Sequence, residues 1–483
     1  MNTPLRRLAS VVVLMFVVLM GGATWVQYVQ AAAYNNDGRN VRTLYREYGN
    51  ARGPIVVGGT AVASSAPVDD PFGFQRTYAA GEIYAPATGY YSVVYRRSGI
   101  EQWMNTELNG SADSLFYSRL EDLVTGRQRQ GASVELTINP AAQQAAWDAL
   151  GDQTGAVVAL DPTTGAILAM VSKPSYDPNL IAGHDTVAVN AAWTALQEAP
   201  GSPMTNRAIA GATYPPGSTF KLVTAAAALE GGMTGETQVP APVELDLPQT
   251  DRVLRNFGGE SCSPTGTMTL ADAMRISCNT TFGQLGIDLG ADALRAQAEA
   301  FGFDDPLNVP MKVTESHFPE DPSPPETAFS AIGQYEVRVT PMQMAMVAAT
   351  IADGGVQMNP YLVQSVRSSD LTVVSETEPQ ELRRPISAAT AAALRDMMVS
   401  VVNDGTGTAA QINGIQVAGK TGTAQTTADQ APHAWFVAFA PAEAPRIAVA
   451  VVVEHGGTLG SEATGGAVAA PIARAVIRAV LGG

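Results

Sequence analysis

Lysine, histidine and cysteine are scarce in this sequence, and basic residues as a whole are outnumbered. The 483 residues include 29 basic and 45 acidic side chains, which gives a formal net charge of −16 at pH 7. A chain this acidic repels nucleic acid and offers no basic stripe to hold phosphates, so nucleic-acid binding is excluded. Lysine occurs only at Lys173, Lys221, Lys312 and Lys420, and two of these positions lie in the motifs discussed below.

The few histidines offer no pattern for a metal. His184, His317, His433 and His455 stand far apart in the sequence, and none has the ligand spacing of a zinc site. We therefore expect neither a metal nor a cofactor.

Charge is absent from one long stretch near the N-terminus. Arg6 and Arg7 precede an uncharged, almost wholly apolar run from Leu8 to Val26, about one bilayer thickness of helix. Positive charge before the run and none directly after it orients the N-terminus toward the cytoplasm and exports the rest of the chain. A signal peptide cut near the alanines at 31–33 is the alternative, but the run is longer than the usual signal core. We predict a single-pass anchor in the cell membrane with the main domain extracytoplasmic.

Only two cysteines occur, Cys262 and Cys278, and both lie on the exported side of the predicted anchor. A disulfide is compatible with that compartment. Closing a loop of this length contributes about 3 kcal/mol by the chain-entropy estimate. Two cysteines alone do not prove pairing, so two buried free thiols remain the alternative.

The chain divides into three parts. Residues 1–33 form the cytoplasmic stub and anchor. Residues 34–130 contain β-like runs such as Gly89–Tyr95 but no catalytic constellation. The polar, glycine-flanked segment Gly126–Gly131 suits a domain boundary, so we assign residues 131–483 to a larger second domain.

Caps, breakers and apolar runs predict the elements of this second domain. Helices are expected over Asn139–Gly151, from Ser218 onward, and over Thr340–Gly354, Ser387–Val402 and Ala467–Leu481. Strands are expected over Ala156–Leu160 and Ala166–Val171, joined as a hairpin, and over Ala434–Phe439 and Ile447–Val453. Helices placed between hairpin strands indicate an α/β (α+β) fold with helices packed against an antiparallel sheet.

A serine and a lysine three positions apart form the first motif with chemical meaning. Ser218 stands at a predicted helix start and Lys221 follows almost one turn later, so both side chains lie on one face. A buried lysine with a lowered pKa can take the hydroxyl proton and make the serine a nucleophile. Alone this pattern is weak, because it arises by chance with a probability of about 0.2, and Ser218 is then a plain helix cap.

Two further short motifs strengthen this interpretation. Ser277-Cys278-Asn279 is a serine-any-asparagine pattern, of which about one match is expected by chance in a chain of this composition. Lys420-Thr421-Gly422 is flanked by Gly419 and Thr423, and its chance expectation is only about 0.03. All three motifs together arise by accident in roughly one chain in a few hundred.

This set of motifs is shared by penicillin-binding proteins and class A β-lactamases. The surrounding sequence resembles the penicillin-binding proteins over about 330 residues, from near Ala132 to the C-terminus, and the segments that carry the resemblance are Gly155–Asn179, Asn206-Arg207-Ala208, Tyr214–Lys221, Thr340-Pro341-Met342-Gln343 and Ala434-Trp435-Phe436-Val437. The part in front, with Arg52-Gly53-Pro54-Ile55, is similar to the non-catalytic, pedestal or dimerisation-like domain of class B members. It leaves no room for a glycosyltransferase domain.

The resemblance implies a serine penicillin-recognising transpeptidase fold and a peptidoglycan D,D-transpeptidase. In this family the serine attacks the penultimate D-alanine of a stem peptide and expels the terminal D-alanine, and β-lactams acylate the same serine. Ser218 is then the nucleophile and Lys221 the general base. Ser277 and Lys420 relay or steady the proton that goes to the leaving amine.

The same resemblance assigns the substrate contacts. Asn279 binds the peptide amide of the substrate, and Thr421, Gly422 and Thr423 line the place of its terminal carboxylate. The backbone amides of Ser218 and Thr423 form the oxyanion hole, whose paired donors stabilise a transition state by several kcal/mol. The expected partners are peptidoglycan stem peptides, β-lactam antibiotics, the cell membrane, and proteins of cell division or elongation.

Two positions depart from the usual sequence pattern of the family. Cys278 fills the middle of the second motif, where its redox state can influence the site. Tyr335 follows Gly333-Gln334 at a position where many relatives continue with glycine, so the backbone shape there is expected to differ, and we place no substrate contact on it.

Other functions share some of these features. A D,D-carboxypeptidase or a β-lactamase-like hydrolase has the same three motifs and differs in letting water reach the acyl-enzyme. A Ser-His hydrolase that uses His433 as its base is a further alternative. It is disfavoured because this sequence has no glycine-serine-glycine elbow around Ser218. A non-catalytic penicillin sensor or scaffold is the alternative of another class, and a Ser218→Ala variant that still supports growth and shape would favour it.

Overall fold

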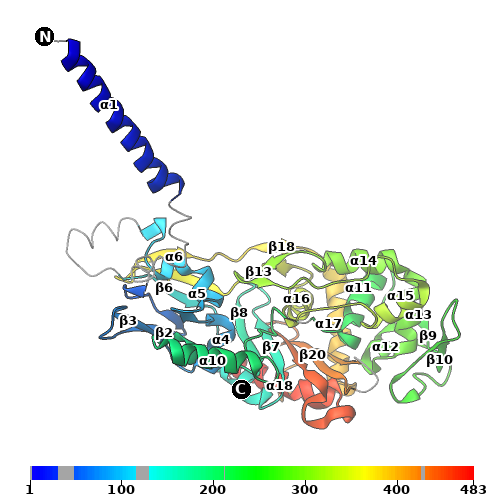
Figure 1. Cartoon of the computed structure of the whole chain (residues 1–483). Coiled ribbons are helices and arrows are strands. Elements are labelled where there is room, and N and C mark those ends of the chain that lie inside the picture. The colour runs from blue at the N-terminus through cyan, green and yellow to red at the C-terminus, as the bar shows by residue number, and fades with distance from the viewer. Residues whose placement is uncertain (1–2, 31–47, 116–129, 212, 426–429, 483) are drawn as a thin grey trace.

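The computed structural model describes residues 3–30, 48–115, 130–211, 213–425 and 430–482 (Figure 1). The alanines at 31–33 and most of the predicted boundary segment Gly126–Gly131 lie outside these residues.

The first helix stands apart from the body of the protein. Helix α1 (Thr3–Thr24) continues into a π-helical turn, η1 (Trp25–Val29), and none of its side chains is buried. Figure 1 shows α1 extending away from the folded domains. The 27 residues from Thr3 to Val29 are long and apolar enough to cross a membrane.

A five-stranded antiparallel sheet forms the centre of the second domain. Its order is β19-β20-β21-β7-β8, and its strands are β19 (Ala418–Ala424), β20 (His433–Ala440), β21 (Ile447–Val453), β7 (Gly155–Leu160) and β8 (Ile167–Lys173). The predicted hairpin is β7–β8, and the two late apolar runs are the central strands β20 and β21. The predicted fold class is confirmed.

Both faces of this sheet are buried, which explains the uninterrupted apolar runs in the sequence. Successive side chains of a strand point to opposite faces. In β20, Trp435, Val437 and Phe439 therefore belong to one hydrophobic core, whereas Phe436 and Ala438 belong to another.

Helices cover the two faces. Helices α8 (Pro140–Leu150) and α18 (Gly465–Leu481) pack together on one of them, and α16 (Pro341–Ala352) crosses the other. Helix α17 (Ala388–Asp404) packs against β19, and α11 (Lys221–Glu230) packs against α17. A helix is present at each predicted place in this domain, although the one expected from Ser218 begins as α11 only at Lys221.

Local hydrogen bonds fix where these helices begin. The side chains of Asn139, Thr340, Ser387 and Thr464 accept from backbone N–H groups in the first turns of α8, α16, α17 and α18. Such caps satisfy donors that have no partner inside the helix, and each contributes about 1 kcal/mol.

The remaining elements of the second domain surround this core. Its further helices are α9 (Asn179–Ala182), α10 (Thr186–Glu198), α12 (Leu270–Ile276), α13 (Asn279–Leu289), α14 (Ala291–Ala300), α15 (Pro324–Ala331) and the 3-10 turns η4 (Phe257–Gly259), η5 (Thr408–Ala410) and η6 (Glu454–Glu462). Short strand pairs are β9 (Gln238–Pro240) with β12 (Thr267–Thr269), β10 (Glu244–Asp246) with β11 (Val253–Arg255), β13 (Leu307–Asn308) with β14 (Lys312–Val313), and β15 (Gln357–Met358) with β18 (Glu381–Arg383).

The N-terminal module contains both strands and short helices. They are β1 (Ile55–Val57), β2 (Thr60–Pro67), β3 (Phe74–Tyr78), α4 (Gly81–Thr88), β4 (Tyr91–Ser92), β5 (Arg96–Arg97), α5 (Gly99–Trp103), α6 (Asn105–Leu108) and η2 (Asp113–Leu115). The β-like run Gly89–Tyr95 contributes only β4, because the chain turns back at once to pair it with β5.

A second sheet connects this module to chain segments far away in sequence. Its order is β17-β16-β6-β1-β2-β3, where β6 is Ser133–Leu136, β16 is Val363–Arg367 and β17 is Val373–Glu376. The boundary near residue 130 stays a prediction, and the sheet continues across it.

A buried ionic cluster holds the N-terminal module together. Glu101 has no exposed surface and accepts from Arg52 Nε at 2.5 Å and from Arg76 Nε at 2.6 Å. Burial acts to raise the pKa of Glu101, but the charges of Arg76 and Arg52 outweigh it, so the pKa lies below its ordinary value.

Replacing Glu101 with glutamine is expected to destabilise the module strongly. Arg52 and Arg76 are then left buried without an anion, which lowers the free energy of unfolding by about 3–5 kcal/mol. Urea unfolding of the purified full chain in detergent measures this change. Glu82→Gln, at an exposed site on α4, is the matched control. Equal effects of the two variants would show that the cluster does not stabilise the fold.

Candidate active site

The segment that carries Ser218 folds as a single tight turn before a helix. Residues Gly217–Phe220 form a 3-10 turn, η3, and α11 begins only at Lys221. The prediction of an α-helix starting at Ser218 was therefore wrong for its first turn. In a 3-10 turn the side chains at i and i+3 are eclipsed, which still places Ser218 and Lys221 on one side.

Close backbone contacts fix this turn between two other segments. Gly217 has φ +53°, and its N–H donates to Gly333 O at 2.9 Å. A Cβ at Gly333 would lie 2.1 Å from Gly217 O, and one at Gly217 would lie 2.8 Å from Thr423 O. Trp435 Nε1 donates to Pro215 O at 3.1 Å. The turn that carries Ser218 thus lies directly against β19.

The second motif forms the turn between α12 and α13. Ser277 ends α12 in the left-handed conformation, with φ +63° and ψ +43°, and Asn279 is the first residue of α13. A left-handed residue other than glycine costs about 1 kcal/mol or more. This turn directs the side chains of Ser277 and Asn279 toward Lys221.

The three motifs meet at the hydroxyl of Ser277. Lys221 Nζ donates to Ser277 O at 2.7 Å, to Ser277 Oγ at 3.3 Å and to Asn279 Oδ1 at 2.8 Å. Lys420 Nζ donates to Ser277 Oγ at 2.8 Å and to Thr421 O at 2.9 Å. Among the described residues no hydrogen bond joins Lys221 Nζ to Ser218 Oγ, so the lysine is held by the second motif.

Both lysines have no exposed surface, and this burial alters their protonation. Burial and the charge of Lys420 lower the pKa of Lys221 well below its ordinary value. Burial lowers the pKa of Lys420 to about 7. A neutral amine, able to accept a proton, is therefore accessible near neutral pH.

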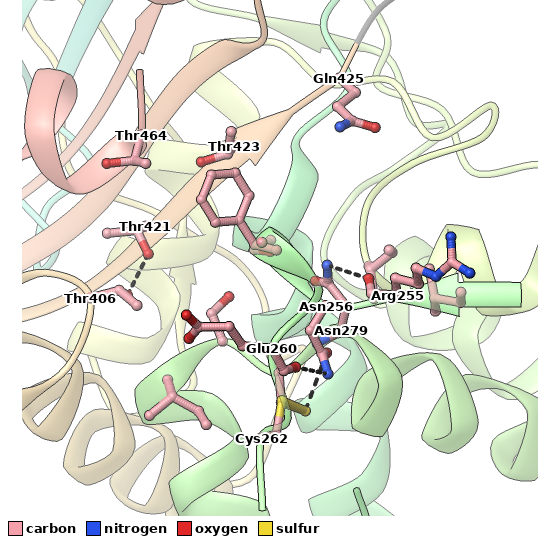
Figure 2. Close-up of a pocket in the computed structure, with 18 of the residues that line it drawn as sticks. Arg255, Asn256, Glu260, Cys262, Asn279, Thr406, Thr421, Thr423, Gln425 and Thr464 are labelled. Carbon is pink, nitrogen blue, oxygen red and sulfur yellow. Dashed lines mark hydrogen bonds between the residues drawn. A yellow bond between two sulfur atoms is a disulfide. The ribbon is translucent and has the colours of Figure 1, made fainter. Parts of the chain in front are cut away.

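A cleft of about 910 Å³ lies in front of these lysines. Ser218, Ser277, Asn279, Thr421 and Thr423 line it, whereas the two lysines lie behind its wall. Figure 2 shows Thr421 and Thr423 on one side of the cleft and Asn279 on the other.

Two further threonines on this wall were not predicted from the sequence. Thr406 and Thr464 line the cleft beside Thr421 and Thr423 (Figure 2). The hydroxyls of Thr406 and Thr421 lie 2.6 Å apart and form a hydrogen bond. Thr406 follows α17 and lies outside the three motifs, so no local pattern in the sequence predicts its contact with Thr421.

The remaining predicted positions have other surroundings. A Cβ at Gly422 would lie 2.9 Å from both Pro216 O and Trp435 Cβ, so this glycine allows close packing behind the cleft and is not among the residues that line it. Tyr335 has φ +61°, a conformation that favours glycine, although a tyrosine stands there.

The histidines take no part in this cleft. His433, at the start of β20, accepts from the backbone N–H of His455 at 3.1 Å, and burial lowers its pKa to about 4. Within the part of the chain that the structure describes, no group of three or more His, Cys, Asp or Glu side chains gathers to hold a metal ion.

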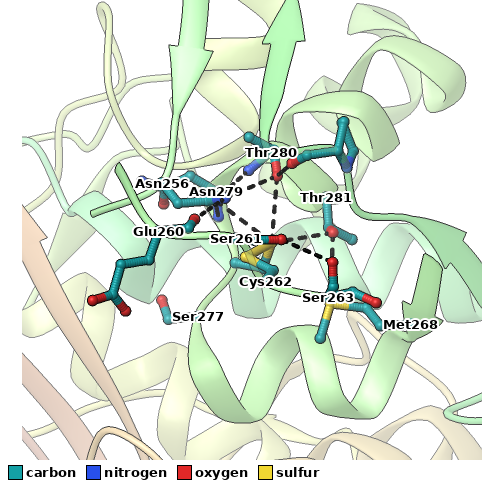
Figure 3. Close-up of a disulfide and its surroundings, with 12 residues drawn as sticks. Asn256, Glu260, Ser261, Cys262, Ser263, Met268, Ser277, Asn279, Thr280 and Thr281 are labelled. Carbon is teal, nitrogen blue, oxygen red and sulfur yellow. Dashed lines mark hydrogen bonds between the residues drawn. A yellow bond between two sulfur atoms is a disulfide. The ribbon is translucent and has the colours of Figure 1, made fainter. Parts of the chain in front are cut away.

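The two cysteines are joined in the structure. Cys262 and Cys278 form a disulfide with an S–S distance of 2.14 Å and a Cα–Cα distance of 6.0 Å (Figure 3). The bond connects the loop after β11 directly to the second motif, and both cysteines border the cleft.

Comparison with known proteins agrees with this geometry. The family profile of the penicillin binding protein transpeptidase domain matches residues 155–478, and that of the penicillin binding protein A dimerisation domain matches residues 52–134. The chain therefore belongs to the penicillin-binding protein transpeptidase family.

Several similar proteins of that family are penicillin-binding proteins A from mycobacteria and their relatives. The chain is 47% identical over its full length to the peptidoglycan D,D-transpeptidase PbpA of Mycolicibacterium smegmatis, of which it covers 99%. Two acyl-enzyme structures of penicillin-binding protein A from M. tuberculosis are also 47% identical to this chain, and each is covered to 100%. The ceftriaxone complex matches 90% of this chain with a TM-score of 0.88. The penicillin G complex matches 89% of this chain with a TM-score of 0.85. The predicted similarity of the N-terminal segment to a dimerisation domain of this family is confirmed.

The lowered pKa of Lys420 is directly testable, because the chain has so few lysines. With lysine ε-carbons labelled with carbon-13, we expect the NMR signal that is lost in Lys420→Met to titrate with a midpoint near pH 7. The side chain is charged below that midpoint and neutral above it. A midpoint close to the ordinary value of about 10.4 would show that burial does not lower the pKa of Lys420.

Proposed function

We propose that this chain is a peptidoglycan D,D-transpeptidase that works through an acyl-enzyme on Ser218. The observation that carries the proposal is the convergence of Lys221 and Lys420 on Ser277 Oγ behind the cleft that Ser218 lines. The identity to curated D,D-transpeptidases over the whole chain supports the same reaction.

Acylation uses the neutral amine of Lys221. Ser218 Oγ attacks the carbonyl carbon of the penultimate D-alanine, and its proton passes to Lys221 Nζ. We assign the oxyanion hole to the backbone amides of Ser218 and Thr423, since the turn that begins at Gly217 packs against β19 beside Thr423. Although Lys221 has no hydrogen bond to Ser218 in the structure, such contacts often tighten only when substrate binds.

Collapse of the intermediate releases the terminal D-alanine. The bond from the carbonyl carbon to the leaving nitrogen breaks, and that nitrogen takes a proton through Ser277 Oγ, which Lys221 and Lys420 both contact. Since the pKa of Lys420 is about 7, this side chain can give and recover a proton near neutral pH. An acceptor amine then attacks the ester, forms the crosslink and returns a proton to Ser218 Oγ.

The two walls of the cleft bind opposite ends of the donor peptide. Asn279 Oδ1 is engaged by Lys221, and its Nδ2 faces Arg255 O at 3.2 Å, which leaves one amide hydrogen for a substrate carbonyl. Thr421 and Thr423 donate to the terminal carboxylate from the other wall, near the charge of Lys420. Gly422 acts between them by allowing close packing.

We infer that the reaction takes place outside the cytoplasm. Arg6 and Arg7 stand at the N-terminal end of the candidate membrane helix, and this arrangement favours a cytoplasmic N-terminus. The N-terminal module is then held near the membrane surface, where it can recruit proteins of division or elongation.

Ser218→Ala is expected to abolish covalent labelling by penicillin. Intact mass should show one adduct on the wild type, mapped to the tryptic peptide Ala208–Lys221, and none on the variant. Loss of the nucleophile should lower the acylation rate by at least about a thousandfold. Ser375→Ala, at an exposed serine of β17, is the control and should label normally.

The products distinguish a transpeptidase from a hydrolase. With a stem-peptide donor and an acceptor amine, we expect crosslinked product to exceed free acid. Free acid as the dominant product would instead indicate a carboxypeptidase or a β-lactamase-like enzyme. Full growth and shape in cells that carry only the Ser218→Ala chain would favour a penicillin sensor or scaffold.

A further inference from the structure

The first turn of α13 is capped by a residue from another segment. Asn256 lies in the loop between β11 and Cys262, and its Oδ1 accepts from Asn279 N at 2.9 Å and from Thr280 N at 3.0 Å. Its Nδ2 donates to Glu260 O at 3.1 Å and lies 3.3 Å from Thr280 Oγ1. One side chain thus connects both ends of its own loop to α13.

This outside cap replaces one that the helix cannot make for itself. The residue at the N-cap position is Cys278, whose side chain forms no cap hydrogen bond and is committed to the disulfide. The first N–H groups of a helix have no partner within it and need an acceptor from elsewhere. Asn256 supplies that acceptor at the helix that carries part of the candidate active site.

The capped residue is also the one that holds Lys221. Asn279 Oδ1 accepts from Lys221 Nζ at 2.8 Å, and Asn279 Nδ2 donates to Arg255 O at 3.2 Å, next to Asn256 in the chain. A shift of the first turn of α13 therefore moves an acceptor of the lysine amine. Reacting groups tolerate little such movement, since a displacement of about 1 Å can cost a hundredfold in rate.

We propose that Asn256 is a positioning residue for acylation, which acts by fixing the N-terminus of α13 and through it Asn279 and Lys221. This inference rests on the proposed function of Ser218 and Lys221. Asn256 itself needs no contact with the reacting atoms.

The disulfide is a second link between the Asn256 loop and the start of α13. Cys262–Cys278 joins the far end of the Asn256 loop to the residue just before Asn279, and Figure 3 shows Asn256, Cys262 and Asn279 gathered around this bond. Because the hydrogen bonds of Asn256 and the covalent bond restrain one junction, each should limit the damage when the other is lost. Their effects on acylation should therefore not be independent.

Three variants of the full chain test the proposal. Asn256→Ala removes the cap, and Asn256→Asp keeps an acceptor for the two N–H groups. Asn139→Ala is the matched control, because Asn139 Oδ1 caps α8 by accepting from Ala141 N and Ala142 N, away from the cleft. The measurements are the second-order rate constant for acylation by penicillin and the midpoint of thermal unfolding.

We expect Asn256→Ala to lower the acylation rate constant by at least about tenfold, Asn256→Asp to stay within about threefold of the wild type, and Asn139→Ala within about twofold. Both alanine variants should lower the unfolding midpoint. Normal acylation in Asn256→Ala would overturn the proposal. So would an equal loss in Asn139→Ala, which indicates general destabilisation, or a loss in Asn256→Asp as large as that in Asn256→Ala.

Reduction provides an independent arm, because these are the only two cysteines of the chain. With dithiothreitol, the loss in Asn256→Ala should exceed the product of the losses caused by reduction alone and by the substitution alone. Losses that simply multiply would refute the idea that Asn256 and the disulfide restrain the same junction. If Ser218→Ala still labels with penicillin, the proposed function itself fails, whereas an inert Ser218→Ala with a fully active Asn256→Ala defeats only the inference about Asn256.

Discussion

The site depends on two lysine amines buried side by side around one hydroxyl. Lys221 and Lys420 both contact Ser277 Oγ, and neither has any exposed surface. Burial lowers the pKa of both lysines, and the charge of Lys420 lowers the pKa of Lys221 further. The close contact of Gly217 with β19 and the left-handed backbone of Ser277 bring the three motifs together in this arrangement.

Much of the fold could be predicted because the signals are local. Asn139 marks the start of α8 within one turn, and the apolar run of β20 reports burial on both faces. The motif lysines could be assigned to one site because their spacing matches a known family. The first turn after Gly217 is different, since its 3-10 geometry follows from contacts with Gly333 and Thr423 that lie far away in sequence.

What could not be predicted depends on long-range contacts between segments without a motif. The second sheet pairs β1 with β6, and it pairs β6 with β16, whose residues lie more than two hundred positions away in sequence. Thr406 meets Thr421 only because the loop after α17 returns to β19. The contacts of Asn256 are of the same kind, since a single asparagine in a loop gives no indication of the helix that it caps.

We infer that all three motifs surround the hydroxyl of Ser218 and that this hydroxyl reacts with penicillin. A crystal structure of the penicillin-treated protein tests this most directly. We expect an ester bond to Ser218 Oγ, with the amines of Lys221 and Lys420 still within hydrogen-bond distance of Ser277 and the carboxylate of the drug against Thr421 and Thr423. An ester on another side chain, or lysines that point away into separate regions, would contradict it.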